Sequence, residues 1–347
     1  NLTKIAGVDL FLLGADHKSL PANEYRMNEE GDSVLLVQPL PYLAECARID
    51  LHLQKGFMKM NLQSVDVQRV QLSQLEPDTA FVNHFKPQER AVSDYLDRSI
   101  GYFVRPLRYS DALFGPSAWL DVKHEMQLWC TGADISICNI GSEVGDLEAG
   151  TFTMRDLFHY IDNDHKMWVV PMTGEEIYSF LEASAAAQYN QMSSPADHLL
   201  AFQYNDLNEV IIGSDGPVLV QDKDLFCSAA GIRYTVDVTK PAGERVKIQC
   251  LSNGSPFSMT ETYRVAVSDY LALGGGGYTA ALNWDKSTAL RRLDFNGTLS
   301  LRTHFINFVK AHKNYNPVSH SNWEVIPRSY FEAGSKRDYQ MMKRYIQ

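Results

Sequence analysis

The alternation of hydrophobic and polar residues predicts a strand-rich beginning of the chain. Gly7–Gly14 and Ser33–Val37 are short, mainly apolar segments of the kind that form buried strands. Ala47–Leu53 alternates with a period of two, as a half-buried strand does, and Phe57–Leu62 follows at a distance that allows the two to pair. A polar stretch from Asp66 to Pro77 ends this part.

Helical patterns appear after that stretch. Pro87–Ile100 places apolar side chains on one helical face, and we interpret it as a connector between two units. Ser117, Thr153 and Thr173 each precede a helical pattern with a side chain suited to cap it. The expected helices span 117–128, 153–159 and 173–189, and the expected strands span 133–138, 166–172, 233–238, 245–250 and 263–267.

The mixture of these elements indicates a mixed α/β (α+β) fold. Turns of the hairpin type, Pro241–Gly243 and Asn253–Gly254, join the last three expected strands. A chain of 347 residues with 45% hydrophobic residues can bury one large core and has room for a second unit.

Charge and composition argue against several classes of protein. The net charge of −10 argues against binding to a nucleic acid polymer, although a local pocket of donors can still hold a small anion. We expect no membrane span, because no apolar run approaches the roughly 18 to 20 residues that one needs. The five cysteines lack a C-x-x-C pair, which argues against a structural zinc site and a disulfide framework. The first residues show neither an initiator Met nor a signal peptide, so we expect the middle of a longer gene product.

Four short segments carry candidate chemistry. Asp16 and His17 follow an expected strand, and their side chains are of the kinds that bind metals. Two such residues do not make a site, and a histidine at the protein surface is the favoured interpretation. The glycine run Gly274–Gly277, flanked by tyrosines, allows a backbone to approach a ligand beside a stacking ring, and equally fits a flexible turn before a helix. Asn139–Ser142 after an expected strand, and the polar loop Asp162–His165, fit ligand contacts or plain turns. No nucleophile motif, P-loop or dinucleotide fingerprint is present.

Several long strings together resemble the C-terminal domain of the 5'-nucleotidase family, most closely its bacterial 2',3'-cyclic-nucleotide phosphodiesterase branch. The resemblance runs from about residue 85 to the end. The strings are FGPSAWLDVKHEMQLWCTGADISICN (Phe114–Asn139), AGTFTMRDLF (Ala149–Phe158), MTGEEIYSFLEAS (Met172–Ser184), SSPADHLL (Ser193–Leu200), SAAGIRYTVDVTKPAGERV (Ser228–Val246) and YRVAVSDYLALGGGGY (Tyr263–Tyr278).

The resemblance implies a fold and a division into domains. It implies a four-layer α/β/β/α C-terminal, nucleotide-binding domain at 103–347, a linker and connecting helix at 66–102, and at 1–65 a strand-rich remnant of a calcineurin-like metallophosphoesterase domain. In that domain of the family, a Gly-His-x-His motif helps to hold a pair of divalent metal ions such as manganese or zinc. Here Ala15 replaces the first histidine, His17 matches the second, and the upstream metal-binding motifs are absent. The resemblance therefore implies His17 as a metal ligand, with an incomplete centre, no catalytic residue and no bound metal in this chain alone.

The family holds a nucleoside by placing its base between two aromatic rings, and this implies the remaining site residues. Tyr270 matches the second ring, and Asn163 stands at the position of the first. Gly275 and Gly276 fall on the glycines that approach the base, and Asn139 falls on the asparagine of the N-G-G-x-I-R motif. Val144 replaces the arginine of that motif.

Three hypotheses about function follow from the resemblance. The first is the nucleotide-binding portion of a metal-dependent hydrolase that acts on 5'-nucleotides or 2',3'-cyclic nucleotides in nucleotide catabolism, with an upstream metallophosphoesterase domain as its partner. The second is a non-catalytic nucleotide-binding or sensing protein, which the departures at Ala15, Asn163 and Val144 favour. The third is an envelope protein that kept only the fold. The family also implies a periplasmic, cell-envelope or secreted location.

Overall fold

The computed structural model describes most of the chain, which forms two compact units, Asn1–Glu89 and Arg90–Gln347. The described residues are 4–14, 24–40, 43–56, 60–141, 145–213 and 216–343. The expected division into segments 1–65, 66–102 and 103–347 stays a prediction.

A small three-stranded sheet opens the first unit. β3 (Ser33–Val37) is its central strand, parallel to β1 (Leu10–Leu12) and antiparallel to β2 (Glu24–Met27). The apolar side chains of β3 are at most 1% exposed, which agrees with the buried strand expected from its sequence.

A long antiparallel hairpin follows, formed by β4 (Glu45–Lys55) and β5 (Met60–Gln71). The pairing of the two segments was expected, but β5 continues through Asp66 into the stretch expected to be a polar connection. The hairpin is largely exposed, so polar side chains on β5 can point to solvent and do not oppose pairing. The 3-10 turn η2 (Leu72–Gln74) ends it.

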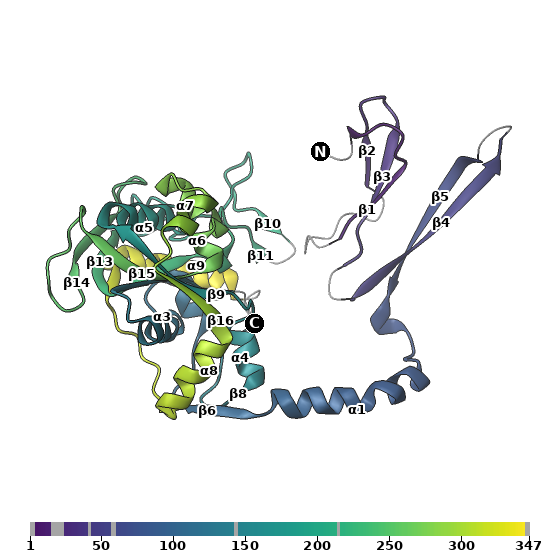
Figure 1. The fold of residues 1–347 in the computed structure, drawn as a ribbon. Coiled ribbons are helices and arrows are strands. Elements are labelled where there is room, and N and C mark those ends of the chain that lie inside the picture. The colour runs from purple at the N-terminus through teal and green to yellow at the C-terminus, as the bar shows by residue number, and fades with distance from the viewer. Residues whose placement is uncertain are drawn as a thin grey trace. The chain divides into compact units, whose positions relative to one another are not determined.

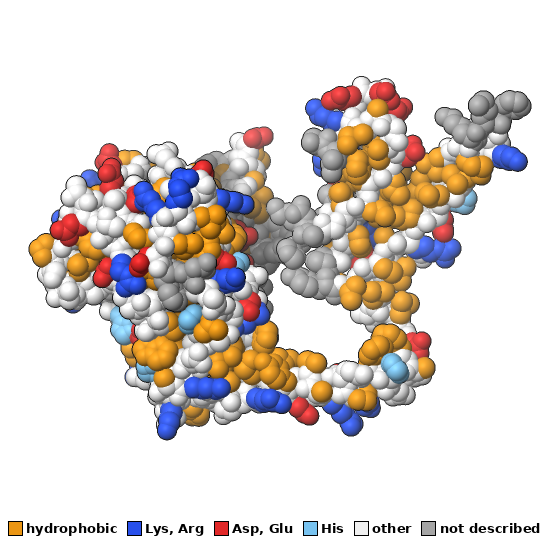
Figure 2. Space-filling model, viewed as in Figure 1, with side chains coloured by type: hydrophobic (Ala, Val, Ile, Leu, Met, Phe, Trp, Pro, Cys, Tyr) orange, Lys and Arg blue, Asp and Glu red, His pale blue; other side chains and the backbone are white. Residues whose placement is uncertain are grey.

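The helix α1 (Thr79–Leu96) begins earlier than the sequence suggested and contains Pro87 inside it. Asp78 caps its start, because the Asp78 carboxylate accepts hydrogen bonds from the backbone amides two and three residues ahead, at 2.9 and 3.1 Å. The expected helical residue Ile100 lies instead in β6 (Ser99–Phe103). Figure 2 shows hydrophobic side chains along α1, none of whose residues is buried by the described part of the chain.

The second unit is built on a five-stranded sheet with the order β12-β7-β15-β9-β16. β7 and β15 are parallel, and the remaining neighbours are antiparallel. The strands expected at 133–138, 166–172 and 263–267 are confirmed as three adjacent strands of this sheet, of which Figure 1 labels β15 and β9. The strands are β12 (Cys227–Ala230), β7 (Ile135–Asn139), β15 (Thr262–Ser268), β9 (Lys166–Thr173) and β16 (Phe295–Ser300).

Helices cover this sheet, and their starts follow the sequence. Ser117 caps α3, and Thr153 and Thr173 form capping boxes with Asp156 and Glu176. Figure 1 shows α3 and α8 on one side of β15 and α5 on the other. The helices are α2 (Tyr109–Phe114), α3 (Ala118–Thr131), α4 (Met154–Tyr160), α5 (Gly174–Gln188), α6 (Asp269–Ala272), α7 (Lys286–Arg291), α8 (Leu301–His312) and α9 (Arg328–Met342), with 3-10 turns η3 (Lys223–Leu225) and η4 (Gly275–Leu282).

Smaller sheets complete the unit. The turn Pro241–Gly243 joins β13 to β14 as expected, but Asn253–Gly254 makes no hairpin. β15 pairs with β7 and β9 instead of β14, because its apolar residues suit the middle of a sheet covered on both faces. These sheets contain β14 (Val246–Leu251), β13 (Ile232–Asp237) and β18 (Trp323–Ile326); β17 (Asn314–Tyr315), β6 and β8 (Gly150–Thr153); and β10 (Ile212–Gly213) with β11 (Gly216–Pro217).

The mixed α+β class is therefore confirmed. None of the helices in the described ranges has the length and hydrophobicity that a membrane crossing requires.

Candidate functional site

A cavity of about 350 Å³ lies in the second unit, at the end of the central sheet where β7 and β15 finish and β9 begins. The carboxyl ends of neighbouring parallel strands are a common place for ligands in α/β sheets. The lining residues that matter for its chemistry are Lys123, Asn139, Asn163, His165, Asp222 and Tyr270.

The ring of Tyr270 forms one wall of the cavity. Tyr270 lies in α6, directly after β15, and is 36% exposed. Gly275 packs against this ring so closely that a Cβ atom there would come within 2.3 to 2.5 Å of three ring carbons. A glycine at 275 therefore sets the position of the ring.

Gly276 plays a different part from Gly275. Its φ of 74° is in the left-handed region that favours glycine, and its carbonyl oxygen accepts a hydrogen bond from Gln221 Nε2 at 3.2 Å. A Cβ atom at Gly276 would meet the ring of Tyr278 at 2.8 Å. The glycine run thus shapes the backbone behind Tyr270, and neither Gly275 nor Gly276 is among the residues that line the cavity.

Asn139 and Asn163 both lie on the cavity wall. The amide of Asn139 donates to the carbonyl oxygen of Asp224 at 2.9 Å, and that of Asn163 donates to Asp162 Oδ2 at 2.7 Å. The structure therefore brings together Asn139, Asn163 and Tyr270 as the sequence suggested, while Asn163 offers no ring for stacking.

His165 was not among the predicted site residues, although it belongs to the polar loop noted in the sequence. Its ring stacks on Tyr270 with a centroid distance of 5.0 Å and an interplanar angle of 28°. The Nδ1 atom of His165 lies 3.3 Å from Asp269 Oδ1. The antiparallel pairing of β9 with β15 brings the residue before β9 and the helix after β15 to the same end of the sheet, and the sequence analysis predicted the two strands without their pairing.

Among the Lys, Asp and Glu residues that line the cavity, the acidic ones outnumber the single lysine. Lys123 is buried, and its Nζ donates to the carbonyl oxygens of Ile140 and Asn139. Burial lowers the pKa of Lys123, and nearby carboxylates such as Asp162 raise it in part. Asp222 and Asp224 also line the cavity, so its acceptors suit a ligand with hydroxyl or amino groups.

Behind the cavity wall, the His124 side chain is fully enclosed and bonds to hydroxyls at both ring nitrogens. Its Nδ1 lies 2.9 Å from Ser136 Oγ and its Nε2 lies 3.0 Å from Ser228 Oγ. Burial lowers the pKa of His124 to about 3. This histidine is therefore neutral at pH 7 and acts in packing.

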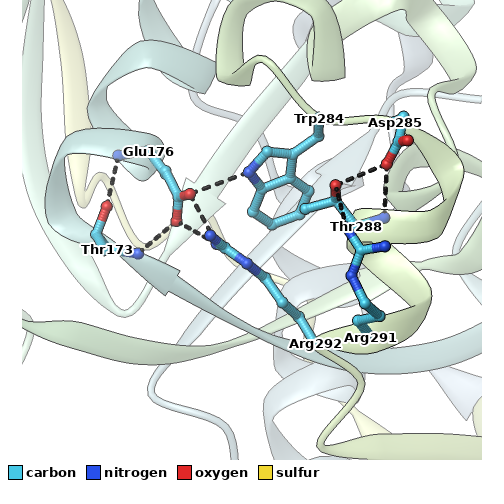
Figure 3. Close-up of polar contacts among 7 residues, drawn as sticks. All are labelled: Thr173, Glu176, Trp284, Asp285, Thr288, Arg291 and Arg292. Atoms are coloured by element: carbon cyan, nitrogen blue, oxygen red, sulfur yellow. Dashed lines mark hydrogen bonds and ion pairs between the residues drawn. The ribbon is translucent and has the colours of Figure 1, made fainter.

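The segment that follows the glycine run is held to the start of α5 by Glu176 (Figure 3). The Glu176 carboxylate accepts from Trp284 Nε1 at 3.0 Å and from Arg292 Nη1 at 2.7 and 2.9 Å. It also accepts the Thr173 backbone amide at 2.8 Å as part of the capping box. We refer to Thr173, Glu176, Trp284 and Arg292 as the Glu176 cluster.

The expected metal ligand His17 and the substituted positions Ala15 and Val144 lie outside the described residues. Within the described ranges, no three His, Cys, Asp or Glu side chains are grouped so that they could hold a metal ion. The described part of the chain therefore offers a binding cavity and does not offer a metal centre.

Comparison with known proteins gives one family match. The sequence profile of the 5'-nucleotidase C-terminal domain matches residues 103–283. The chain is 23% identical to the trifunctional nucleotide phosphoesterase protein YfkN of Bacillus subtilis, in a match that covers 94% of this chain and 24% of that protein.

Solved structures show the same fold. A putative 5'-nucleotidase from Staphylococcus aureus, in complex with alpha-ketoglutarate, superposes with a TM-score of 0.66 at 18% identity, over 91% of this chain and 56% of that one. A 5'-nucleotidase precursor from Thermus thermophilus superposes with a TM-score of 0.53 at 19% identity, over 94% of this chain and 61% of that one. The chain thus spans about a quarter of the curated relative and less than two thirds of each of these structures.

Proposed function

Because the chain belongs to the 5'-nucleotidase C-terminal domain family, we propose that it is the part of a metal-dependent phosphoesterase that binds the nucleoside moiety of the substrate. The substrates we propose are 5'-nucleotides or 2',3'-cyclic nucleotides, hydrolysed in nucleotide catabolism. A relative described as a nucleotide phosphoesterase supports this class of substrate.

The observation that carries the proposal is the partly exposed Tyr270 ring on the wall of a cavity of about 350 Å³. This volume lies within the range of small-molecule sites. A nucleic acid base stacked on an aromatic ring gains roughly 1 to 3 kcal/mol. Asp222 lines the same cavity, and its carboxylate can accept from a ribose hydroxyl or an exocyclic amine.

The reaction itself requires groups beyond the described residues. A pair of divalent ions such as manganese or zinc would supply a Lewis acid and an activated water for attack on the phosphate ester. We propose that an upstream metallophosphoesterase domain provides most of their ligands, and that His17 is one ligand from this chain. The second unit then holds the nucleoside and orients it.

Calorimetric titration with adenosine and with 2',3'-cyclic AMP tests the proposed site. We expect weak binding that is lost in Tyr270→Ala, because the stacking surface is removed. Tyr102→Ala is a matched control, since Tyr102 is a comparably exposed tyrosine of β6 outside the cavity. An unchanged titration with Tyr270→Ala removes Tyr270 from the site and contradicts the proposal.

The alternative function is a non-catalytic nucleotide-binding protein. Asn163 favours it, because this cavity residue supplies an amide where relatives of the family are expected to supply a ring. We expect no phosphatase turnover by this chain with added manganese or zinc, and clear turnover would show that the proposed ligand count is wrong. A periplasmic or cell-envelope location is proposed from the family alone, and cell fractionation of the full-length protein tests it.

A further inference from the structure

We propose that the His165 ring occupies the surface of Tyr270 on which a base stacks, and that a base binds by replacing His165. This inference rests on the proposed function and concerns the control of the same site. The stacked ring pair, with a centroid distance of 5.0 Å, is the starting observation.

The space between the two rings is too small for a ligand. Aromatic carbon atoms reach their best contact at about 3.5 Å, so a base between two rings needs a separation of about 7 Å. The centroid distance of 5.0 Å leaves no room for one. A base can therefore reach this surface of Tyr270 only if the rings move apart or one ring leaves.

The pairing of β15 with β9 holds the backbones next to the two rings. β15 and β9 pair from Thr262 opposite Thr173 to Ser268 opposite Met167. Tyr270 follows this ladder in α6, and His165 directly precedes β9. The Lys166 amide donates to Asp269 Oδ1 at 3.2 Å next to the last pair of the ladder, so moving the two backbones apart would break hydrogen bonds beside both rings.

The His165 backbone is also held from another side, because its carbonyl oxygen accepts a hydrogen bond from the Leu301 amide at 2.7 Å. Its side chain is less restricted, being 36% exposed. Rotation of the imidazole costs one stacking contact and one partly exposed contact with Asp269, whereas parting the strands costs sheet hydrogen bonds. The geometry therefore favours rotation of His165 over insertion of the base between the rings.

The face of the Tyr270 ring next to Gly275 is not accessible to a base. The close packing of Gly275, whose Cβ would lie 2.3 Å from the ring, excludes a ligand there. The surface covered by His165 is thus the one that a base can take.

Asp269 holds the covering ring in place. Its Oδ1 atom lies 3.3 Å from His165 Nδ1 and accepts the Lys166 backbone amide at 3.2 Å. Replacing Asp269 with asparagine keeps an oxygen for the Lys166 amide and removes the charge that attracts the imidazole. The pair of His165 and Asp269 acts as a latch on the stacking surface.

Calorimetric titration with adenosine tests whether the His165 ring competes with a base for the surface of Tyr270. We expect His165→Ala to bind adenosine about tenfold more tightly than the unmodified chain, because the competing ring contact and the contact with Asp269 are gone. Asp269→Asn is expected to give a smaller increase in affinity. His159→Ala, which removes an exposed histidine of α4 away from the cavity, is expected to leave the affinity unchanged.

Weaker binding by His165→Ala would overturn the proposal, because it would show that the His165 ring stacks on the base and contributes to its affinity. Unchanged binding would overturn it as well. If the unmodified chain binds and Tyr270→Ala does not, the proposed function stands whatever His165→Ala does. If neither the unmodified chain nor His165→Ala binds, the proposed function and the latch both fail.

Nitration of Tyr270 by tetranitromethane gives a ligand-free measurement. Tyr270 should react faster in His165→Ala, and an equal rate would contradict the proposal that His165 covers the ring.

Discussion

Replacing Glu176 with alanine is expected to destabilise the second unit and to loosen the segment that follows the glycine run. In the Glu176 cluster one carboxylate accepts from Trp284 Nε1, Arg292 Nη1 and the Thr173 backbone amide, at distances between 2.7 and 3.0 Å. All three donors lose this acceptor in Glu176→Ala.

The magnitude follows from these contacts. The bond from Arg292 joins charged groups, but the Arg292 side chain is 39% exposed, so we assign it about 1 kcal/mol, below the range for buried charged bonds. Loss of the bond from the Thr173 backbone amide costs about 1 kcal/mol, and an indole N–H without its acceptor also costs about 1 kcal/mol. The sum of about 3 kcal/mol lowers the melting temperature of a unit of this size by about 6 to 12 °C.

Thermal unfolding followed by calorimetry measures this effect. Glu175→Ala is the matched control, since Glu175 is exposed and occupies the same first turn of α5 outside the Glu176 cluster. Glu176→Gln should fall between the two, because its amide oxygen still accepts one bond. We also expect weaker adenosine binding in Glu176→Ala alone. A melting temperature equal to that of Glu175→Ala would refute the reasoning.

Three further predictions follow from the structure. Gly275→Ala should abolish adenosine binding by calorimetry while leaving the far-UV circular dichroism unchanged, because the added Cβ displaces the Tyr270 ring. Asp338→Ala should cost about 3 kcal/mol of unfolding free energy in urea, because this fully buried carboxylate accepts from two backbone amides and a histidine. In urea unfolding, the free energy of unfolding should also fall as the pH drops from about 6.5 toward 3. In this range His124 binds a proton in the unfolded state and, with a pKa of about 3, does not bind one in the folded state. His124 therefore contributes a slope of at most about 1.4 kcal/mol per pH unit. That slope should be smaller in His124→Gln, and an equal slope in both proteins would contradict the assignment.

Local features of the fold could be predicted from the sequence, because they depend on neighbouring residues. Ser117, Thr153 and Thr173 were expected to cap helices and do so. The start of α1 was wrong because Pro87 was taken as the beginning of the helix, whereas Asp78 caps it a turn or more earlier. The pattern alone could not distinguish a tolerated proline from a first helical residue.

Features that depend on distant segments could not be predicted in the same way. The sequence suggested a hairpin at Asn253–Gly254, but the order of the central sheet is decided by which segments bury their apolar side chains together. His165 was missed for the same reason, because its contact with Tyr270 exists only through the pairing of β9 with β15. Tyr270, Asn139 and Asn163 were placed by resemblance to the family, and the structure puts all three on one cavity.

The place of Asn163 on the cavity wall has a consequence for redesign of the protein. The ring of residue 165 already stacks on Tyr270, whereas residue 163 reaches the cavity from the loop before β9. A phenylalanine installed at 163 in a chain that also carries His165→Ala would offer a second flat surface without crowding the first. The affinity of the cavity for a heterocycle could then be varied by substitutions at residues 163 and 270.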